Sequence, residues 1–277
     1  MDTVSKRPSS GGQADVLGKH VESGRRRLGR DKVAATARDT GALSDLVAAH
    51  GDAVLPLALD ITDKAAVTES VRRAHEHFGR LDVVVNNAGY GLFGMVEELT
   101  GDDLRAQFET NLFGTVWVVQ AALPTSVLRA VATPSTVSSL LGVASFPTTG
   151  GYAASKAAVE ALLDSLAQEV AGFGVNVTVV EPGPFGTEFN SSSAYSAPLP
   201  AYDSFREAVQ ASFATNPSPD PAGVGPALLK VVDADTPPSR IFFGTFPLQV
   251  VPQLYADRVK GWQEWAELSA EAEAGPA

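Results

Sequence analysis

Apolar, strand-like runs alternate with stretches of helical spacing from about residue 33 onwards, and this alternation restricts the fold more than any other feature of the chain. The strand-like runs cover residues 32–37, 53–60, 81–89, 135–139, 175–183 and 240–244. The helical stretches cover residues 42–50, 64–79, 102–128, 152–171 and 248–270. Apolar strands separated by helices are typical of a parallel sheet covered on both faces. The sequence therefore predicts an α/β fold with a doubly wound parallel sheet in a single domain.

The composition indicates a folded protein without membrane spans or disulfides. Of the 277 residues, 44% are hydrophobic and none is cysteine. No apolar run reaches the roughly 18 residues of a membrane helix, and the N-terminus lacks the apolar core of a signal peptide. The net charge of −11 disfavours nucleic acid as a partner, although Gly24–Arg30 is a basic run. We expect a cytoplasmic protein with no nucleic-acid and no membrane partner.

Polar and glycine-containing segments follow three of the predicted strands. They are Asn86–Gly89, Ser138–Ser139 and Glu181–Gly183. Because ligands of open parallel sheets bind outside the carboxyl ends of the strands, these segments should line one crevice. A stretch rich in serine and proline at residues 185–221 is expected to be a loop that covers substrate. His75 and His77 are two residues apart on a predicted helix and therefore do not form a metal site.

Tyr152 and Lys156 lie four residues apart on a predicted helix, so their side chains share one face. A phenol has a pKa near 10, which is too high for proton transfer at neutral pH. A neighbouring ammonium stabilises the phenolate and lowers that pKa. A hydroxyl at the end of the preceding strand could hold the reacting oxygen, and Ser139 stands thirteen residues before Tyr152. Ser138 is the alternative for this position.

These motifs occur together and in a fixed order. The chain has the turn "NNAG" after a strand, the asparagine of "TNLFG" in a long helix, a serine thirteen residues before "YAASK", and "PG" after the next strand. From about Lys32 to about Ala270 it resembles the classical short-chain dehydrogenase/reductase family. That family has a Rossmann-like fold, binds NAD(P), and forms homodimers or homotetramers.

The resemblance implies a role for each matching residue. Tyr152 would be the catalytic acid/base, Lys156 would lower its pKa and bind the nicotinamide ribose, Ser139 would bind the substrate oxygen, and Asn111 would maintain a proton-relay water. The cofactor-binding positions would be Arg38, Asp60, Asn86, Ala88, Gly89, Lys156, Pro182, Gly183 and Thr187. Plainer roles stay open: Asn111 as a cap at a helix kink, Asp60 as a turn residue, and Arg38 as a surface charge. No metal is implied.

Arg38 bears on the choice of cofactor. Members of the family that select NAD place an acidic side chain at the end of this strand, where it accepts hydrogen bonds from the ribose 2′-hydroxyl. Here the strand ends in Arg38, and a guanidinium suits a 2′-phosphate. NADP is therefore the expected cofactor, with NAD as the alternative.

The sequence departs from the family at its N-terminus. The family opens with an apolar central strand and a glycine-rich turn that holds pyrophosphate, whereas residues 1–32 match neither. The first strand and its phosphate-binding turn are thus not predicted, and their loss would leave a gap in the sheet. Pro134 is a second departure, since proline is disfavoured inside a central strand.

A translated frame shift would explain both departures, and resequencing the gene tests it; a genuinely divergent N-terminus is the alternative.

We divide the chain into this N-terminal segment, ordered or disordered, and a Rossmann-like domain at 33–277. The expected function is an NADP(H)-preferring oxidoreductase that interconverts a secondary alcohol and a ketone, both small molecules. The rival is a non-catalytic binding or scaffold protein that keeps the fold but has lost its cofactor.

Overall fold

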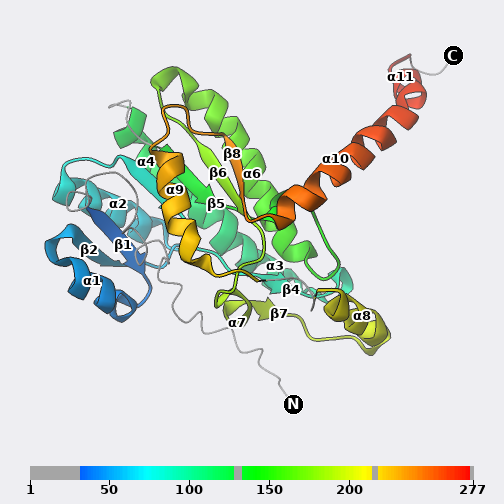
Figure 1. Ribbon diagram of the computed structural model, residues 1–277, viewed down its shortest axis with the longest axis horizontal. Helices are drawn as coiled ribbons and strands as arrows, with labels where there is room; N and C mark the ends of the chain where they lie inside the picture. Colours follow the sequence, from blue (N-terminus) through cyan, green and yellow to red (C-terminus); the bar gives the residue numbers. More distant parts are fainter. Residues whose placement is uncertain (1–31, 128–132, 214–217, 275–277) are drawn as a thin grey trace.

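A computed structural model describes residues 32–127, 133–213 and 218–274 of the chain (Figure 1). Its strands are β1 (Val33–Ala37), β2 (Val54–Ala58), β3 (Val83–Asn86), β4 (Leu92–Phe93), β5 (Thr133–Val137), β6 (Thr178–Pro182), β7 (Ala194–Tyr195) and β8 (Arg240–Phe243). The pairings among them are parallel. These strands confirm the predicted parallel α/β architecture.

The strands of the main layer form two hydrogen-bonded groups. Strands β3, β5, β6 and β8 pair in that order, while β1 pairs only with β2 within the described part of the chain. Among the described residues no strand lies hydrogen-bonded between β1 and β3, which is where the family's first strand would belong. The predictions for residues 1–31, including their order and the frame shift, lie outside the described residues.

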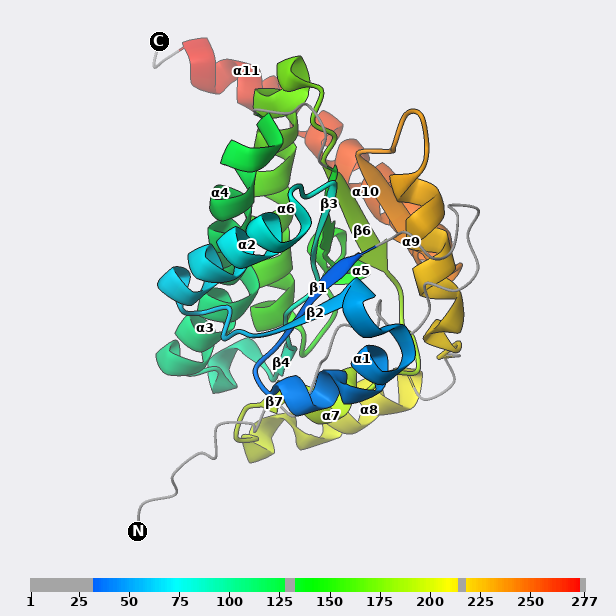
Figure 2. The same ribbon diagram turned by 90° about the vertical axis from the view of Figure 1, so that its left-hand side faces the viewer.

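Helices cover both faces of this layer (Figure 2). They are α1 (Ser44–His50), α2 (Lys64–Phe78), α3 (Gly101–Phe108), α4 (Gly114–Val127), α5 (Leu140–Val143), α6 (Gly150–Val170), α7 (Phe189–Ser192), α8 (Asp203–Phe213), α9 (Val224–Val232), α10 (Phe246–Glu264) and α11 (Ala266–Ala274). Helices α2, α4 and α6 lie on one side, and α1, α9 and α10 lie on the other. The sheet is therefore doubly wound, as the sequence predicts.

Helix α6 is fixed by an apolar stripe at helical spacing. Val159, Leu163, Leu166 and Val170 recur every three or four residues, and all four are buried in one cluster with Val179 of β6. Complete burial of side chains of this size contributes about 1.5–3 kcal/mol each. Tyr152 and Lys156 continue this buried face toward the start of the helix, so the stripe holds them at a defined distance from the strand ends.

The long helix predicted at residues 102–128 is interrupted in its middle. Helices α3 and α4 are joined by a π-helical turn, Glu109–Phe113, which contains Asn111. Such a turn inserts one extra residue into the helix and often marks a functional position. No periodicity in the sequence indicates it, because the apolar pattern continues through the turn.

The serine- and proline-rich segment at residues 185–221 contains more regular structure than the predicted loop. It holds α7, β7 and α8, and β7 pairs with β4 from the other half of the chain. Figure 1 shows these elements gathered at one end of the molecule. Serine and proline mark the turns between the short elements, which is why the composition resembled that of a loop.

Strand β5 includes Pro134, contrary to the expectation from proline's missing N–H donor. The backbone of Pro134 pairs with Val84 of β3, one residue after the strand begins. Proline is tolerated near the start of a strand, where the ladder is incomplete. The predicted strand at residues 135–139 is thus displaced by two residues toward the N-terminus.

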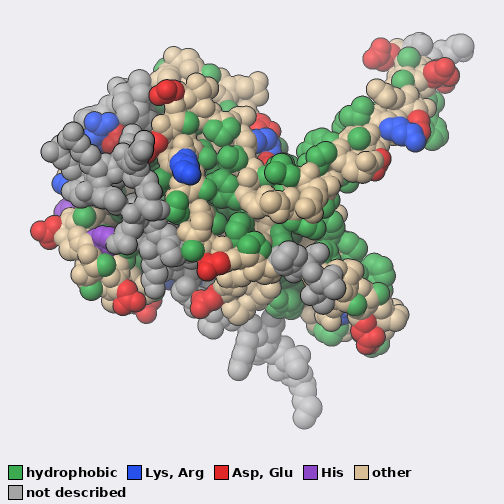
Figure 3. All heavy atoms as spheres, in the orientation of Figure 1, with side chains coloured by type: hydrophobic (Ala, Val, Ile, Leu, Met, Phe, Trp, Pro, Cys, Tyr) green, Lys and Arg blue, Asp and Glu red, His purple; other side chains and the backbone are tan. Residues whose placement is uncertain are grey.

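Helix α10 extends away from the rest of the molecule (Figures 1 and 3). Its exposed side chains include several large apolar ones, among them Leu248, Tyr255 and Trp262, which is 70% exposed. This helix and α11 together replace the single C-terminal helix predicted at residues 248–270. Across the described ranges, no helix combines the length and the apolar character needed to cross a membrane.

Candidate active site

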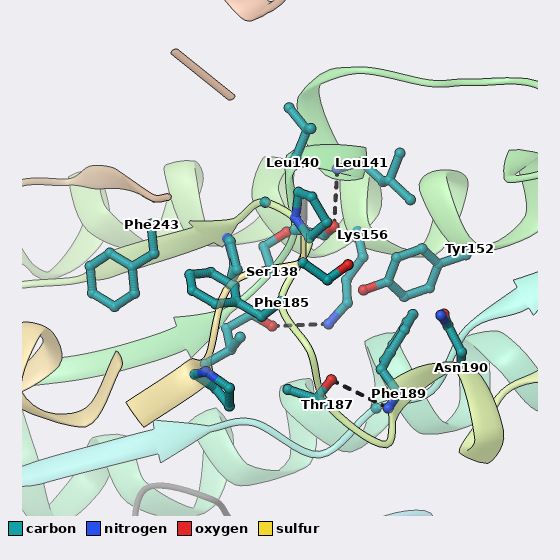
Figure 4. Close-up of a pocket in the computed structure, with 18 of the residues that line it drawn as sticks. Ser138, Leu140, Leu141, Tyr152, Lys156, Phe185, Thr187, Phe189, Asn190 and Phe243 are labelled. Carbon is teal, nitrogen blue, oxygen red and sulfur yellow. Dashed lines mark hydrogen bonds between the residues drawn. The ribbon is translucent and has the colours of Figure 1, made fainter. Parts of the chain in front are cut away.

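A cavity of about 700 Å³ opens at the carboxyl ends of β5 and β6. Its floor is formed by residues at the ends of these strands, Ser138–Ser139 and Pro182–Gly183, and one wall by Tyr152 and Lys156 of α6. Aromatic side chains close the other walls (Figure 4); they are Phe93, Phe146, Phe185, Phe189, Phe213, Phe243 and Phe246. The predicted crevice is therefore present, and it is mainly apolar.

Tyr152 and Lys156 are both buried and lie side by side. Tyr152 is 4% exposed and Lys156 is 5% exposed. Nζ of Lys156 lies 5.8 Å from the centroid of the Tyr152 ring and donates a hydrogen bond of 2.9 Å to the carbonyl oxygen of Val137. The lysine is thus tied to the end of β5 while it faces the phenol.

Burial dominates the acid–base properties of this pair. It raises the pKa of the Tyr152 phenol above its usual value, and a hydrogen bond with Ser139 acts in the opposite direction. Burial also lowers the pKa of the Lys156 ammonium to about 8, opposed by the negative charge of Glu160. Desolvation of the phenol therefore outweighs the hydrogen bond with Ser139, and the Tyr152 pKa is raised where the sequence predicted a lowering by Lys156.

The two neighbouring serines have different partners. Ser139 caps the N-terminus of α5, where its Oγ accepts the N–H of Leu141 at 3.1 Å, and it also hydrogen-bonds Tyr152. Ser138 is 3% exposed, and its hydroxyl donates to Oε1 of Glu160 at 2.6 Å. Ser139 is therefore the hydroxyl available beside Tyr152, whereas that of Ser138 is already engaged.

Asn111 links the π-helical turn to the rest of the site. Its Nδ2 donates to the carbonyl oxygen of Tyr90 and to Oγ of Ser155, and its Oδ1 accepts the N–H of Tyr90. A Cβ placed on Gly89 would lie 3.0 Å from Oδ1 of Asn111 and 3.5 Å from Nζ of Lys156. Glycine at position 89 therefore leaves room for these two side chains to approach the turn.

Of the three cofactor-binding residues predicted in the turn after β3, two lie outside the cavity lining and one lies within it. Asn86 is buried below the cavity, where its Nδ2 donates to Oγ1 of Thr136 at 3.3 Å. Ala88 is half-buried in the turn. Of the three, only Gly89 lines the cavity, together with the neighbouring Asn87.

Pro182, Gly183 and Thr187 all line the cavity. The N–H of Gly183 donates to the carbonyl oxygen of Phe243 at 2.9 Å, and a Cβ at this position would lie 2.9 Å from Cδ of Pro247. The close approach of Pro247 requires glycine here. Thr187 is exposed, and its Oγ1 accepts the N–H of Phe189 at 3.3 Å.

Arg38 and Asp60 lie beyond β1 and β2, outside the cavity lining. Oδ1 of Asp60 accepts hydrogen bonds from the N–H and the hydroxyl of Thr62 at 2.9 and 2.7 Å. These bonds lower the pKa of the Asp60 carboxyl, and the positive charge of Arg38 lowers it further. The neighbouring Asp39 caps the next helical turn by accepting the N–H of Gly41. Arg38 itself is exposed.

A model of the short chain dehydrogenase family matches residues 12–196 of the sequence. The chain belongs to this family. It is an oxidoreductase that acts on CH–OH and C=O groups.

Relatives of this dehydrogenase cover most of its length. Oxidoreductase BOA17 of Botryotinia fuckeliana is 38% identical over 245 residues, which is 86% of this chain and 89% of the relative. A crystal structure of a short-chain dehydrogenase from Streptomyces avermitilis is 35% identical, with a TM-score of 0.81 over 87% of this chain and 89% of the other. A short chain dehydrogenase from Burkholderia cenocepacia in complex with NADP is 25% identical, with a TM-score of 0.65 and coverage of 84% and 85%.

Sequence reasoning missed two buried carboxylates of this dehydrogenase. Glu98 accepts hydrogen bonds from the N–H groups of Met95 and Leu199 and forms an ion pair with Arg206. It therefore links the segment before α8 to the turn after β4. Glu160 lies behind the Tyr152–Lys156 pair. The i, i+4 spacing of Lys156 and Glu160 was a signal for the second carboxylate, whereas Leu199 and Arg206, which bind Glu98, lie about a hundred residues away and left none.

Proposed function

We propose that this short-chain dehydrogenase is an NADP(H)-preferring enzyme that interconverts a secondary alcohol and a ketone. The observation that carries the proposal is the buried Tyr152–Lys156 pair, with Ser139 beside it, on the wall of an apolar cavity. A buried phenol, a buried ammonium and a hydroxyl at one point are the groups needed to move a proton at a carbonyl oxygen.

The cavity suits a nicotinamide cofactor on the side of Lys156. Gly89 and Gly183 leave the backbone accessible there, and Pro182 and Thr187 complete the wall. These residues would bind the nicotinamide and its ribose, with Asp60 further along toward the adenine. A bound nicotinamide supplies or accepts the hydride. The NADP-bound relative from Burkholderia cenocepacia supports this class of cofactor.

The protein's own residues account for the proton transfer. Tyr152 would donate a proton from its hydroxyl to the carbonyl oxygen during reduction and remove it during oxidation. Ser139 would donate a hydrogen bond to the same oxygen and so fix its position. Lys156 would stabilise the phenolate by its charge, and Asn111 would keep the turn at Tyr90 and Gly89 in place. Apolar walls exclude water, which strengthens these electrostatic interactions.

Arg38 supports the preference for NADP. Its guanidinium is exposed at the carboxyl end of β1, whereas the carboxylate of Asp39 is engaged as a cap. A guanidinium binds phosphate through several charge-assisted hydrogen bonds. The 2′-phosphate is the group that distinguishes NADP from NAD, so Arg38 would discriminate between them.

The aromatic walls favour an apolar substrate. Phe93, Phe189 and Tyr152 stand with ring centroids 5.3–6.3 Å apart, and Phe146 packs on Phe213 at 5.8 Å. An apolar ketone would bury its surface on these rings. Catalytic efficiency toward ketones of increasing chain length should therefore rise, and Phe189→Ala should flatten the trend.

Titration of the protein's fluorescence with NADPH, and then with NADH, tests the proposal. We expect saturable binding, tighter for NADPH, and an Arg38→Ala variant that binds NADPH about tenfold more weakly with NADH unchanged. Arg105→Ala is the matched control, because Arg105 is exposed on α3 and pairs only with Asp102 among the described residues. Equal loss of both cofactors in Arg38→Ala would contradict the role of Arg38.

The non-catalytic alternative has one observation of the sequence in its favour: the family's glycine-rich phosphate-binding turn is not recognisable in residues 1–32. Failure of a folded protein to bind either dinucleotide would support this second candidate, a binding protein in which Tyr152 and Lys156 are inherited but idle.

We also propose that the dehydrogenase forms a homodimer or homotetramer through the helices that carry Asn111 and Tyr152. Phe113, 38% exposed, stacks on Trp117 at 5.9 Å between ring centroids and offers an apolar surface there. Light scattering on a size-exclusion column measures the mass, and Phe113→Glu should reduce it to that of a monomer.

A further inference from the structure

Glu160 is a buried carboxylate on the same face of α6 as the Tyr152–Lys156 pair. It follows Lys156 by four residues and Tyr152 by eight, and it is 3% exposed. Its Oε1 accepts the hydroxyl of Ser138 at 2.6 Å, and its Oε2 accepts Nη1 of Arg240 at 2.7 Å. Both oxygens therefore have donors, one from the end of β5 and one from β8.

The carboxylate also packs against the backbone of α5, the short helix that Ser139 caps. A Cβ on Gly142 would overlap Oε1 of Glu160 and lie 2.9 Å from Oγ of Ser138. Only glycine leaves room for the carboxylate at this place. Glu160 thus contacts the turn that presents Ser139 to the cavity as well as the helix that presents Lys156.

Arg240 connects this carboxylate to the remaining charges that face it. Its guanidinium donates to Glu181 of β6 at 2.5 Å and to Asp164 of α6 at 2.6 Å. Three carboxylates therefore share one guanidinium. Burial, and then the charge of Glu160, raise the pKa of Glu181 to about 7, so Glu181 takes up a proton near neutral pH.

The charge of Glu160 also reaches the proposed catalytic pair. It raises the pKa of the Lys156 ammonium and of the Tyr152 phenol, since a nearby negative charge favours the protonated form of both. For Lys156 this opposes burial, which favours the neutral amine. Other charged groups packed around Glu160 are those of Arg240, Asp164 and Glu181.

We propose that Glu160 is a positioning residue that joins the Ser139 turn, the Lys156 helix and strand β8 into one unit and places a fixed negative charge behind the Tyr152–Lys156 pair. The inference rests on the proposed function for its kinetic consequences, but not for its effect on Lys156. Two substitutions separate the contributions. Glu160→Gln keeps the shape and the acceptor for Ser138 but removes the charge and the ion pair with Arg240, and Ser138→Ala removes the link to β5.

The first measurement follows the protonation of Lys156 without cofactor or substrate. The ¹³Cε chemical shift of Lys156, identified by its loss in Lys156→Met, is recorded as a function of pH in the full chain. In Glu160→Gln its midpoint should move to lower pH by about one unit. Asp164→Asn is the matched control, because Asp164 binds the same guanidinium but is half exposed and has no bond to Ser138. An unchanged midpoint in Glu160→Gln, or an equal shift in the control, would overturn the proposal.

The second measurement is kinetic and uses the holoenzyme. Glu160→Gln should lower kcat about tenfold with little change in KM, and the basic limb of the pH profile for alcohol oxidation should begin at lower pH. Ser138→Ala should lower kcat without moving the pH profile. A wild-type protein without turnover would contradict the proposed function alone, since the Lys156 midpoint would still decide the role of Glu160. An unchanged kcat in both variants of an active enzyme would overturn the positioning role.

Discussion

Replacing Lys156 by methionine should stabilise the protein while abolishing its proposed activity. The pKa of this lysine is lowered by burial from 10.5 to about 8. One pH unit of pKa corresponds to about 1.4 kcal/mol, so the buried ammonium costs about 3 kcal/mol of folding free energy at pH 7. Methionine has a similar length and no charge, and it removes this cost. It also removes the hydrogen bond to Val137, which is worth about 2 kcal/mol for a charged donor, so we expect a net gain of about 1 kcal/mol at pH 7.

The way in which the stability gain of Lys156→Met changes with pH shows whether the buried ammonium is its cause. The folded state holds the proton of Lys156 less tightly than the unfolded state, so this cost is complete below about pH 8 and disappears as the pH rises toward 10.5. The difference in unfolding free energy between Lys156→Met and wild type should therefore become less favourable to the variant by about 2 kcal/mol from pH 7 to pH 9.5.

Urea unfolding at these two pH values measures that difference. Lys230→Met is the matched control, since it makes the same replacement at an exposed position on α9. A difference between Lys156→Met and wild type that stays constant from pH 7 to pH 9.5 would refute the reasoning.

Three further substitutions test the site and the core. Ser139→Ala should lower kcat/KM about a hundredfold, by the loss of a hydrogen bond to the developing charge, with a small fall in melting temperature because Ser139 also caps α5. Gly89→Ala should lower kcat, because its Cβ would lie 3.0 Å from Oδ1 of Asn111 and displace that side chain; an unaltered rate would show that the turn adapts. Leu163→Ala should cost about 3 kcal/mol in urea unfolding, since Leu163 is fully buried in the core beside α6, whereas a loss below 1 kcal/mol would mean that the cavity collapses.

The sequence predicted the parallel fold and the crevice well because both depend on local patterns. The apolar residues of α6 recur every three or four positions and those of β6 form a continuous run, so each pattern can be read from a short stretch of the sequence. The motif around Tyr152 and Lys156 was recognisable for the same reason, and the structure brings Ser139 to the same cavity.

Features that depend on distant partners could not be predicted. Arg240 reaches Glu160 across 80 residues of sequence, and Arg206 reaches Glu98 across 108. The direction of the Tyr152 pKa shift also depends on how deeply the phenol is buried, and the spacing of residues in the sequence does not show this. The sequence likewise suggested a loop where β7 pairs with β4, because strands of two residues leave no periodicity.

The small core that β1 and β2 share with α1 has a consequence for how the molecule opens. Their cluster with α1 contains few large side chains, chiefly Leu43 and Leu46, and two of its buried members are alanines. Amide protons in this unit should exchange with solvent at a lower opening free energy than those of the sheet beside α6. A dinucleotide that reached from Arg38 to Lys156 would contact both this unit and the sheet beside α6, and would hold the two together. Its binding should therefore slow exchange most strongly in β1 and β2, at the end of the molecule away from the chemistry.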